Sequence, residues 1–99
     1  MNLHILNDVT NFLDGLSEDD AAKIFAHLKS LESNQIEGLI IKPLKGKIKE
    51  LIVRQYRIIF FRIGEKGYAV DAFKKQSQKT PRRIIERAEK IYRDINGHK

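Results

Sequence analysis

A run of β-branched and aromatic residues at positions 56–63 constrains the fold of this chain more than any other feature. Such residues favour a strand over a helix, even with Arg57 and Arg62 inside the run. Residues 64–67, with a glycine at each end, supply a turn, and residues 68–73 return as the next strand. The sequence therefore predicts an apolar β-hairpin.

The alternation of side chains along a strand divides residues 56–63 between two faces. One face takes Tyr56, Ile58, Phe60 and Arg62, and the other takes Arg57, Ile59, Phe61 and Ile63. The returning strand ends in Lys74 and Lys75. We therefore expect cations to gather beside one end of the hairpin.

Helix signals precede the hairpin. We expect an edge strand at residues 2–6 and then a short helix capped by Asp8. A second helix is predicted to begin after Ser17, because acidic residues follow it and suit the positive end of a helix dipole. This helix should end near Asn34.

The remaining segments complete the predicted fold. Residues 38–47 are interpreted as a connecting arm, since Pro43 and Gly46 interrupt regular structure, and Ile48 then enters the sheet. Thr80 and Pro81 begin a last helix. The order predicts an α+β fold, with two N-terminal helices packed on a small, mainly antiparallel sheet and a C-terminal helix.

Composition limits the class of protein. Ninety-nine residues suit a single domain, 1–99, with one core. The chain has no cysteine, no signal-like segment and no long apolar run, so we expect a cytoplasmic protein without disulfides or a membrane partner. His4, His27 and His98 join no motif, and their spacing fits no metal site.

Positive charge is concentrated in the middle and second half of the chain. The net charge is +6, which favours a polyanionic partner without saying which one. The residues 42–49 alone include Lys42, Lys45, Lys47 and Lys49. This group is expected to bind phosphate without reading bases, although a solvated loop explains it nearly as well.

The second half of the chain resembles the RelE/HigB family of bacterial toxins, and especially its phage-related HigB-like branch. The matching succession is Leu44, Gly46, Glu50, Leu51, Tyr56, Arg57, Ile58, Phe73, Lys74, Lys75, Lys79, Thr80, Pro81 and Ala88. Ile52 stands where the family usually has an arginine. Because Arg54 lies two residues on, we expect it to face the same side and to take over part of that charge.

The resemblance implies a RelE-like fold and cleavage of messenger RNA on the ribosome, without a metal or another cofactor. In that reaction the RNA's own 2′-hydroxyl attacks the neighbouring phosphate. The site must deprotonate this hydroxyl, stabilise a phosphorane-like transition state and protonate the leaving oxygen. The usual partner is a cognate antitoxin, commonly a DNA-binding protein of the HigA type.

Two sets of candidate site residues follow. The catalytic candidates are Arg54, Arg57, Lys74, Lys75 and Glu50. The arginines donate forked hydrogen bonds to phosphate, and a lysine or Glu50 serves as the general base. The RNA-binding candidates are Lys45, Lys47, Lys49, Lys79 and Tyr68, the lysines for the backbone and the tyrosine for stacking on a base.

Other interpretations remain open at this point. A ParE-like toxin shares the fold but inhibits DNA gyrase and cuts no RNA. A degenerate, non-toxic nucleic-acid-binding module is a third option. Arg62 is better explained by an ion pair with Glu50 or Asp71 across the sheet than by catalysis.

Overall fold

The α+β class predicted from the sequence is confirmed by the structure, a computed structural model that describes residues 1–97. Its elements are β1 (Asn2–Ile5), α1 (Asn7–Asp14), α2 (Glu18–Glu32), β2 (Ile40–Lys45), β3 (Ile48–Val53), β4 (Tyr56–Ile63), β5 (Lys66–Lys74) and α3 (Arg82–Asn96). None of these helices combines the length and apolar character needed to cross a membrane.

The five strands form one mixed sheet in the order β1-β5-β4-β3-β2. Strands β2 to β5 pair antiparallel with their neighbours in the chain, and β1 adds to β5 in parallel. The predicted hairpin is β4 and β5, and together with β3 it occupies the middle of the sheet. A bulge after Ile59 shifts the register between β4 and β5.

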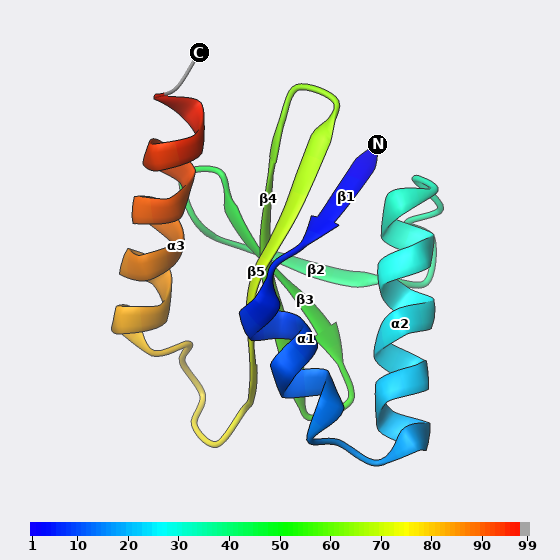
Figure 1. The fold of residues 1–99 in the computed structure, drawn as a ribbon. Coiled ribbons are helices and arrows are strands. Elements are labelled where there is room, and N and C mark those ends of the chain that lie inside the picture. The colour runs from blue at the N-terminus through cyan, green and yellow to red at the C-terminus, as the bar shows by residue number, and fades with distance from the viewer. Residues whose placement is uncertain (98–99) are drawn as a thin grey trace.

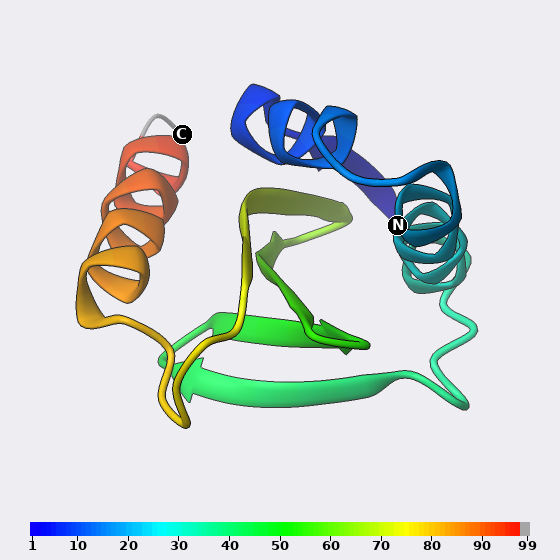
Figure 2. The ribbon, with the colours of Figure 1, turned by 90° about the horizontal axis from the view of Figure 1, so that it is seen from below.

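Helices cover both faces of the sheet, as Figures 1 and 2 show, with α3 on one side and α1 and α2 on the other. Ile58 belongs to the core beneath α1 and α2, whereas its neighbour Ile59 belongs to the core beneath α3. This arrangement confirms the predicted alternation along residues 56–63. Apolar stripes at helical spacing supply the other half of each core, as with Ile24, Leu28 and Leu31 of α2.

The predicted starts of α2 and α3 agree with the structure, and the predicted start of α1 does not. The Ser17 hydroxyl caps α2 by accepting a hydrogen bond from the Asp20 backbone N–H at 3.2 Å. Pro81 precedes α3, and Gly97 follows it. The prediction for Asp8 is wrong, because α1 begins at Asn7 after Leu6, and Asp8 lies in the first turn.

The predicted connecting arm is also wrong, because most of it is the edge strand β2. Ile40 pairs with Ile52, and Lys42 pairs with Glu50, so the segment is part of the sheet. Pro43 is tolerated there because an edge strand has one side with no partner to donate to, and the register shifts between Pro43 and Lys45. The turn after β4 is shorter than predicted, since β5 already begins at Lys66.

Candidate functional site

Glu50 is a charged side chain buried inside the molecule, with 1% of its surface exposed. It lies in β3 on the face that α3 covers, in register with Ile59 of β4. A buried carboxylate is costly unless hydrogen bonds and opposite charges compensate it. The groups that contact Glu50 therefore show how its charge is compensated.

Three side chains approach the Glu50 carboxylate. The Thr80 hydroxyl donates a short hydrogen bond to Oε1. The other oxygen, Oε2, is 3.9 Å from Nε of Arg57 and 4.0 Å from Nζ of Lys75. Both cations are themselves mostly buried, with 15% and 14% of their side chains exposed. One carboxylate thus holds two cations side by side.

Backbone pairing explains how residues so distant in sequence meet. Arg57 pairs with Ile52 across β3 and β4, so it lies on the same face as Glu50 and diagonally next to it. The chain beyond β5 continues along the turn between β3 and β4, where the Lys75 backbone N–H donates to the Gln55 carbonyl at 2.8 Å. Lys75 therefore lies beside this end of the hairpin, as predicted.

Arg57 has unused hydrogen-bonding capacity. Its Nη1 donates to the Arg54 carbonyl at 3.0 Å and to the Tyr56 carbonyl at 2.9 Å. Its buried Nε atom has no hydrogen-bond partner, because the Glu50 oxygen at 3.9 Å is too far away. A buried N–H without an acceptor is rare in native proteins.

A depression of about 290 Å³ opens beside Glu50. Lys42, Lys75 and Lys79 supply cations to its lining, and Thr80 contributes its hydroxyl. Lys42 reaches it because β2 pairs Lys42 directly with Glu50. We call this hollow the Glu50 depression, and its lining offers several positive charges around one buried negative charge.

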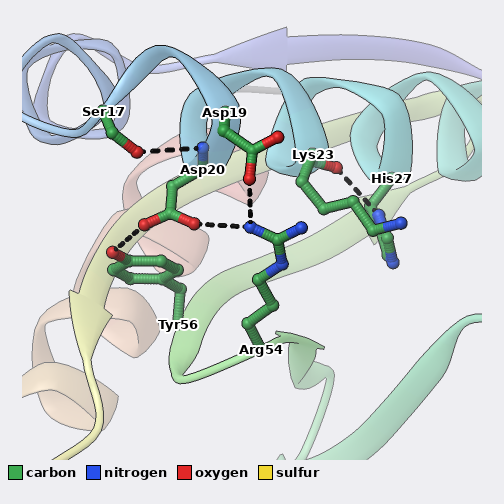
Figure 3. Close-up of polar contacts among 7 residues, drawn as sticks. All are labelled: Ser17, Asp19, Asp20, Lys23, His27, Arg54 and Tyr56. Atoms are coloured by element: carbon green, nitrogen blue, oxygen red, sulfur yellow. Dashed lines mark hydrogen bonds and ion pairs between the residues drawn. The ribbon is translucent and has the colours of Figure 1, made fainter.

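Arg54 does not join this group, and the expectation that it shares the side of Ile52 is wrong. Figure 3 shows its guanidinium directed to the start of α2, where Nη1 donates to Asp19 at 2.8 Å and to Asp20 at 2.7 Å. The Tyr56 hydroxyl donates to the other Asp20 oxygen at 2.6 Å. Arg54 therefore connects the turn between β3 and β4 to α2, on the face opposite Glu50.

These contacts shift three pKa values in the directions expected of such a network. The pKa of Asp20 lies below its usual value, because it accepts hydrogen bonds from Tyr56 and Arg54. The pKa of Tyr56 is raised, chiefly because its hydroxyl donates to Asp20. The pKa of Arg54 is raised above its already high value by its bonds to Asp19 and Asp20.

The other candidate cations are spread over the molecule. Lys74 is exposed and pairs in register with Tyr56, so strand alternation separates it from Lys75, although it also lines a hollow with Lys79 and Arg83. Lys49 pairs with Phe60, whose side chain lies in the core beneath α1 and α2. Lys45 forms an ion pair with Glu89 of α3 at 3.6 Å. Of the predicted RNA-binding lysines, Lys79 lines the Glu50 depression.

Within residues 1–97, the aromatic and histidine side chains lie outside the Glu50 depression. Tyr68 stacks on His4 with ring centroids 5.2 Å apart, and it also contacts Phe61. His27 makes a 2.8 Å hydrogen bond through Nδ1 to the Lys23 carbonyl in its own helix. His98 lies outside the described residues.

Arg62 pairs with neither of the two carboxylates suggested from the sequence. Its Nη2 lies 3.7 Å from Glu65, and its Nε donates to the Gly64 carbonyl at 2.7 Å. Asp71, one of the suggested partners, accepts instead from Arg87 of α3 at 3.2 Å. Arg62 thus takes part in the turn between β4 and β5.

Sequence reasoning did not single out two residues of the Glu50 depression. Lys42 is one of four lysines in residues 42–49, and it differs from the others by its pairing with Glu50. That pairing can be predicted only if β2 is recognised as a strand. Thr80 was interpreted only as a helix start, yet it bonds to Glu50 thirty positions earlier. A threonine in a helix-start motif gives no signal for a partner at that distance.

The fold and the Glu50 depression together define a small α+β structure with a cationic hollow beside strands β2 and β3 of its sheet. The family model of phage derived proteins that are Gp49-like (DUF891) matches residues 11–93. The chain therefore belongs to the Gp49-like family, and its resemblance to HigB-like toxins is confirmed.

Curated relatives agree with this assignment. Proteins named "Probable endoribonuclease HigB1" in two strains of Mycobacterium tuberculosis are each 42% identical to this chain over 64 residues. The match covers 58% of this chain and 51% of each relative, so it spans about half the length of those proteins.

Proposed function

We propose that this chain is the toxin of a toxin–antitoxin system and that it cuts messenger RNA on the ribosome. The observation that carries the proposal is the group of cations around buried Glu50: Arg57 and Lys75 both approach its carboxylate, and Lys75 also lines the Glu50 depression. Membership of the Gp49-like family and likeness to proteins named probable endoribonucleases support RNA as the substrate.

The proposed reaction is an internal transesterification of RNA. The 2′-oxygen passes its proton to a water molecule and attacks the adjacent phosphorus. The bond from phosphorus to the 5′-oxygen then breaks, and that oxygen takes up a proton. Because the nucleophile belongs to the RNA, the protein needs no metal to generate one. Negative charge gathers on the phosphate oxygens in the transition state, and fixed cations stabilise it there.

Arg57 and Lys75 are the proposed catalytic residues. Arg57 keeps 15% of its side chain exposed, and its rigid guanidinium suits donation to a phosphate oxygen. Lys75, an ammonium ion beside a carboxylate, is placed to donate a proton or a hydrogen bond to the leaving 5′-oxygen. Lys42 and Lys79, at the edge of the same hollow, bind neighbouring phosphates.

Glu50 is better suited to positioning than to proton abstraction. Its carboxylate is 1% exposed, and one of its oxygens is already occupied by the Thr80 hydroxyl. We assign it the role of holding Arg57 and Lys75 at a fixed separation. Preorganised charges cost no rearrangement when the transition state forms, which is the advantage of such a device.

Ribosome dependence fits this set of residues. The Glu50 depression holds cations but no pair of histidines for proton transfer among the described residues. A ribosome that orients the messenger RNA supplies part of the catalytic advantage through positioning. We further propose a cytoplasmic protein whose activity is held in check by a cognate antitoxin, a DNA-binding protein of the HigA type.

Induced expression in bacterial cells tests the proposal, with 5′-end mapping of transcripts and a parallel measurement of DNA damage. We expect translation to stop and new 5′ ends to appear inside translated frames within minutes. DNA damage with intact transcripts would instead identify a ParE-like inhibitor of gyrase. Normal growth with neither change would identify a degenerate nucleic-acid-binding module.

A further inference from the structure

A second hollow, of about 440 Å³, lies on the opposite face of the sheet from Glu50. It opens between the C-terminal end of α2 and the part of the sheet where β2, β3 and β4 meet, and we call it the α2 groove. Its apolar lining consists of Met1, Leu31, Ile36, Ile41 and Phe60. Ile36 is 52% exposed, an unusually large apolar exposure beside a hollow.

The lining of the α2 groove also includes three cations, Lys47, Lys49 and Arg62, together with Asn34 and Gly64. Lys49 stands next to Phe60 because the two are paired across β3 and β4. Within residues 1–97, neither Lys47 nor Lys49 has a carboxylate within ion-pair distance, whereas Lys45 nearby is paired with Glu89. Arg62 pairs weakly with Glu65 at 3.7 Å and keeps half of its side chain exposed.

The apolar and cationic residues of the α2 groove together indicate the chemistry of its ligand. Aliphatic side chains of the ligand pack against the apolar residues, and carboxylates of the ligand pair with the cations. Single-stranded RNA fits less well, because it relies on exposed aromatic rings for stacking, and Phe60 is only 5% exposed. Charge and apolarity together therefore favour a protein segment over a nucleic acid.

We propose that the α2 groove is a docking site for an acidic segment of a partner protein that carries apolar side chains on one face. The site is separate from the Glu50 depression, because Lys49 and Glu50 are neighbours in β3 and point to opposite faces of the sheet. Binding at the α2 groove therefore requires no RNA cleavage, and it is tested without any activity assay.

A labelled model peptide tests the proposal on the intact chain. The peptide has leucines on one helical face and glutamates on the other, and its matched control has glutamine in place of each glutamate. We expect the acidic peptide to bind and to shift the backbone amide NMR signals of Ile36, Ile41 and Lys49. The Lys47→Glu/Lys49→Glu variant should weaken binding about tenfold or more, since both charges are reversed.

A charge-matched variant and a competing ligand supply the controls. Lys23→Glu/Lys90→Glu reverses two exposed lysines outside the α2 groove and should leave peptide binding unchanged. Equal binding of the glutamine peptide, or no binding of either peptide, would overturn the proposal. So would a uridine oligoribonucleotide that displaces the acidic peptide and shifts the same amides, because the cations would then serve RNA.

Discussion

Thr80 connects two parts of the molecule that the sequence separates by thirty positions. Its hydroxyl donates to the buried Glu50 carboxylate, and the next residue, Pro81, leads directly into α3. The bond thus joins the centre of the sheet to the start of the helix that covers it. Without it, one oxygen of a buried carboxylate would lose its hydrogen bond, which is costly in a low-dielectric interior.

Replacement of Thr80 by valine should destabilise the protein by about 1–3 kcal/mol, because the shape is kept while the donor to a buried charge is lost. Urea unfolding measures the effect. The Thr80→Ser variant keeps the hydroxyl and serves as the matched control. If valine and serine gave the same free energy of unfolding, the bond to Glu50 would contribute nothing to stability.

Arg54 shows where residue-level reasoning from the sequence reaches its limit. The alternation rule assigned it to the side of Ile52, and that rule holds only while the backbone stays extended. Arg54 has a φ of 55°, a left-handed conformation that non-glycine residues seldom adopt, and the chain turns there. Nothing in the sequence marks this position as left-handed, since the usual signals, glycine and asparagine, are absent from it.

Among the elements, α2 and the turn between β3 and β4 are joined by the network around Asp20. Arg54 and Tyr56 both reach Asp20 at the first turn of the helix (Figure 3). The acidic residues that were expected to suit the helix dipole thus also bind the hairpin. The acidic residues at the start of α2 therefore interact with the dipole of their own helix and also with residues from a distant part of the chain.

The lowered pKa of Asp20 predicts a pH dependence of stability. A carboxyl whose pKa is lower in the folded state stabilises the fold above its ordinary pKa of 3.8, and this contribution disappears as the pH falls through the folded value. We expect Asp20→Asn to lower the melting temperature at neutral pH. The difference from the parent protein should shrink below about pH 4.

Thermal unfolding between neutral and acidic pH measures this difference. Glu37→Gln is a suitable control, since Glu37 is an exposed carboxylate outside the ion pairs found in residues 1–97. A difference between Asp20→Asn and the parent that stayed constant down to the most acidic pH would contradict the role given to Asp20.

The sequence predicted helices and strands correctly where the local signal was strong. It failed for β2, which is a strand only because of its position at the edge of the sheet. The hairpin, α2 and α3 each have a clear period and a clear boundary, and all three were found. Strand β2 was missed because Pro43 is a strand breaker except at an edge, and the edge position depends on the strand order. The same error concealed the pairing of Lys42 with Glu50.

At the scale of the whole molecule, the sheet separates the cations into two groups. Lys42, Arg57 and Lys75 belong to the α3 side with Glu50, whereas Lys49 lines the α2 groove, and Lys47, in the turn between β2 and β3, borders hollows on both sides. The sequence predicted the α+β class, the alternation of residues 56–63 and the gathering at Lys75. It did not predict this division, because the face of each lysine depends on strand register, which is set by tertiary pairing.

Because cations lie on both faces of the sheet, a comparison of the adjacent residues Lys74 and Lys75 tests the proposed site most directly. Lys74 and Lys75 are adjacent and carry the same charge, but Lys75 contacts Glu50 and Lys74 pairs with Tyr56 on the other face. Substitution of either one by alanine changes the net charge equally. Any difference between the two variants therefore reports position rather than total charge.

The decisive measurement is the rate of messenger RNA cleavage by the purified protein, with and without ribosomes, for the parent chain and the Lys74→Ala and Lys75→Ala variants. We predict cleavage that requires ribosomes, that falls about 100-fold or more in Lys75→Ala, and that changes less than about threefold in Lys74→Ala. Equal losses in the two variants would contradict a catalytic site at the Glu50 depression, and cleavage of naked RNA at the full rate would contradict ribosome dependence.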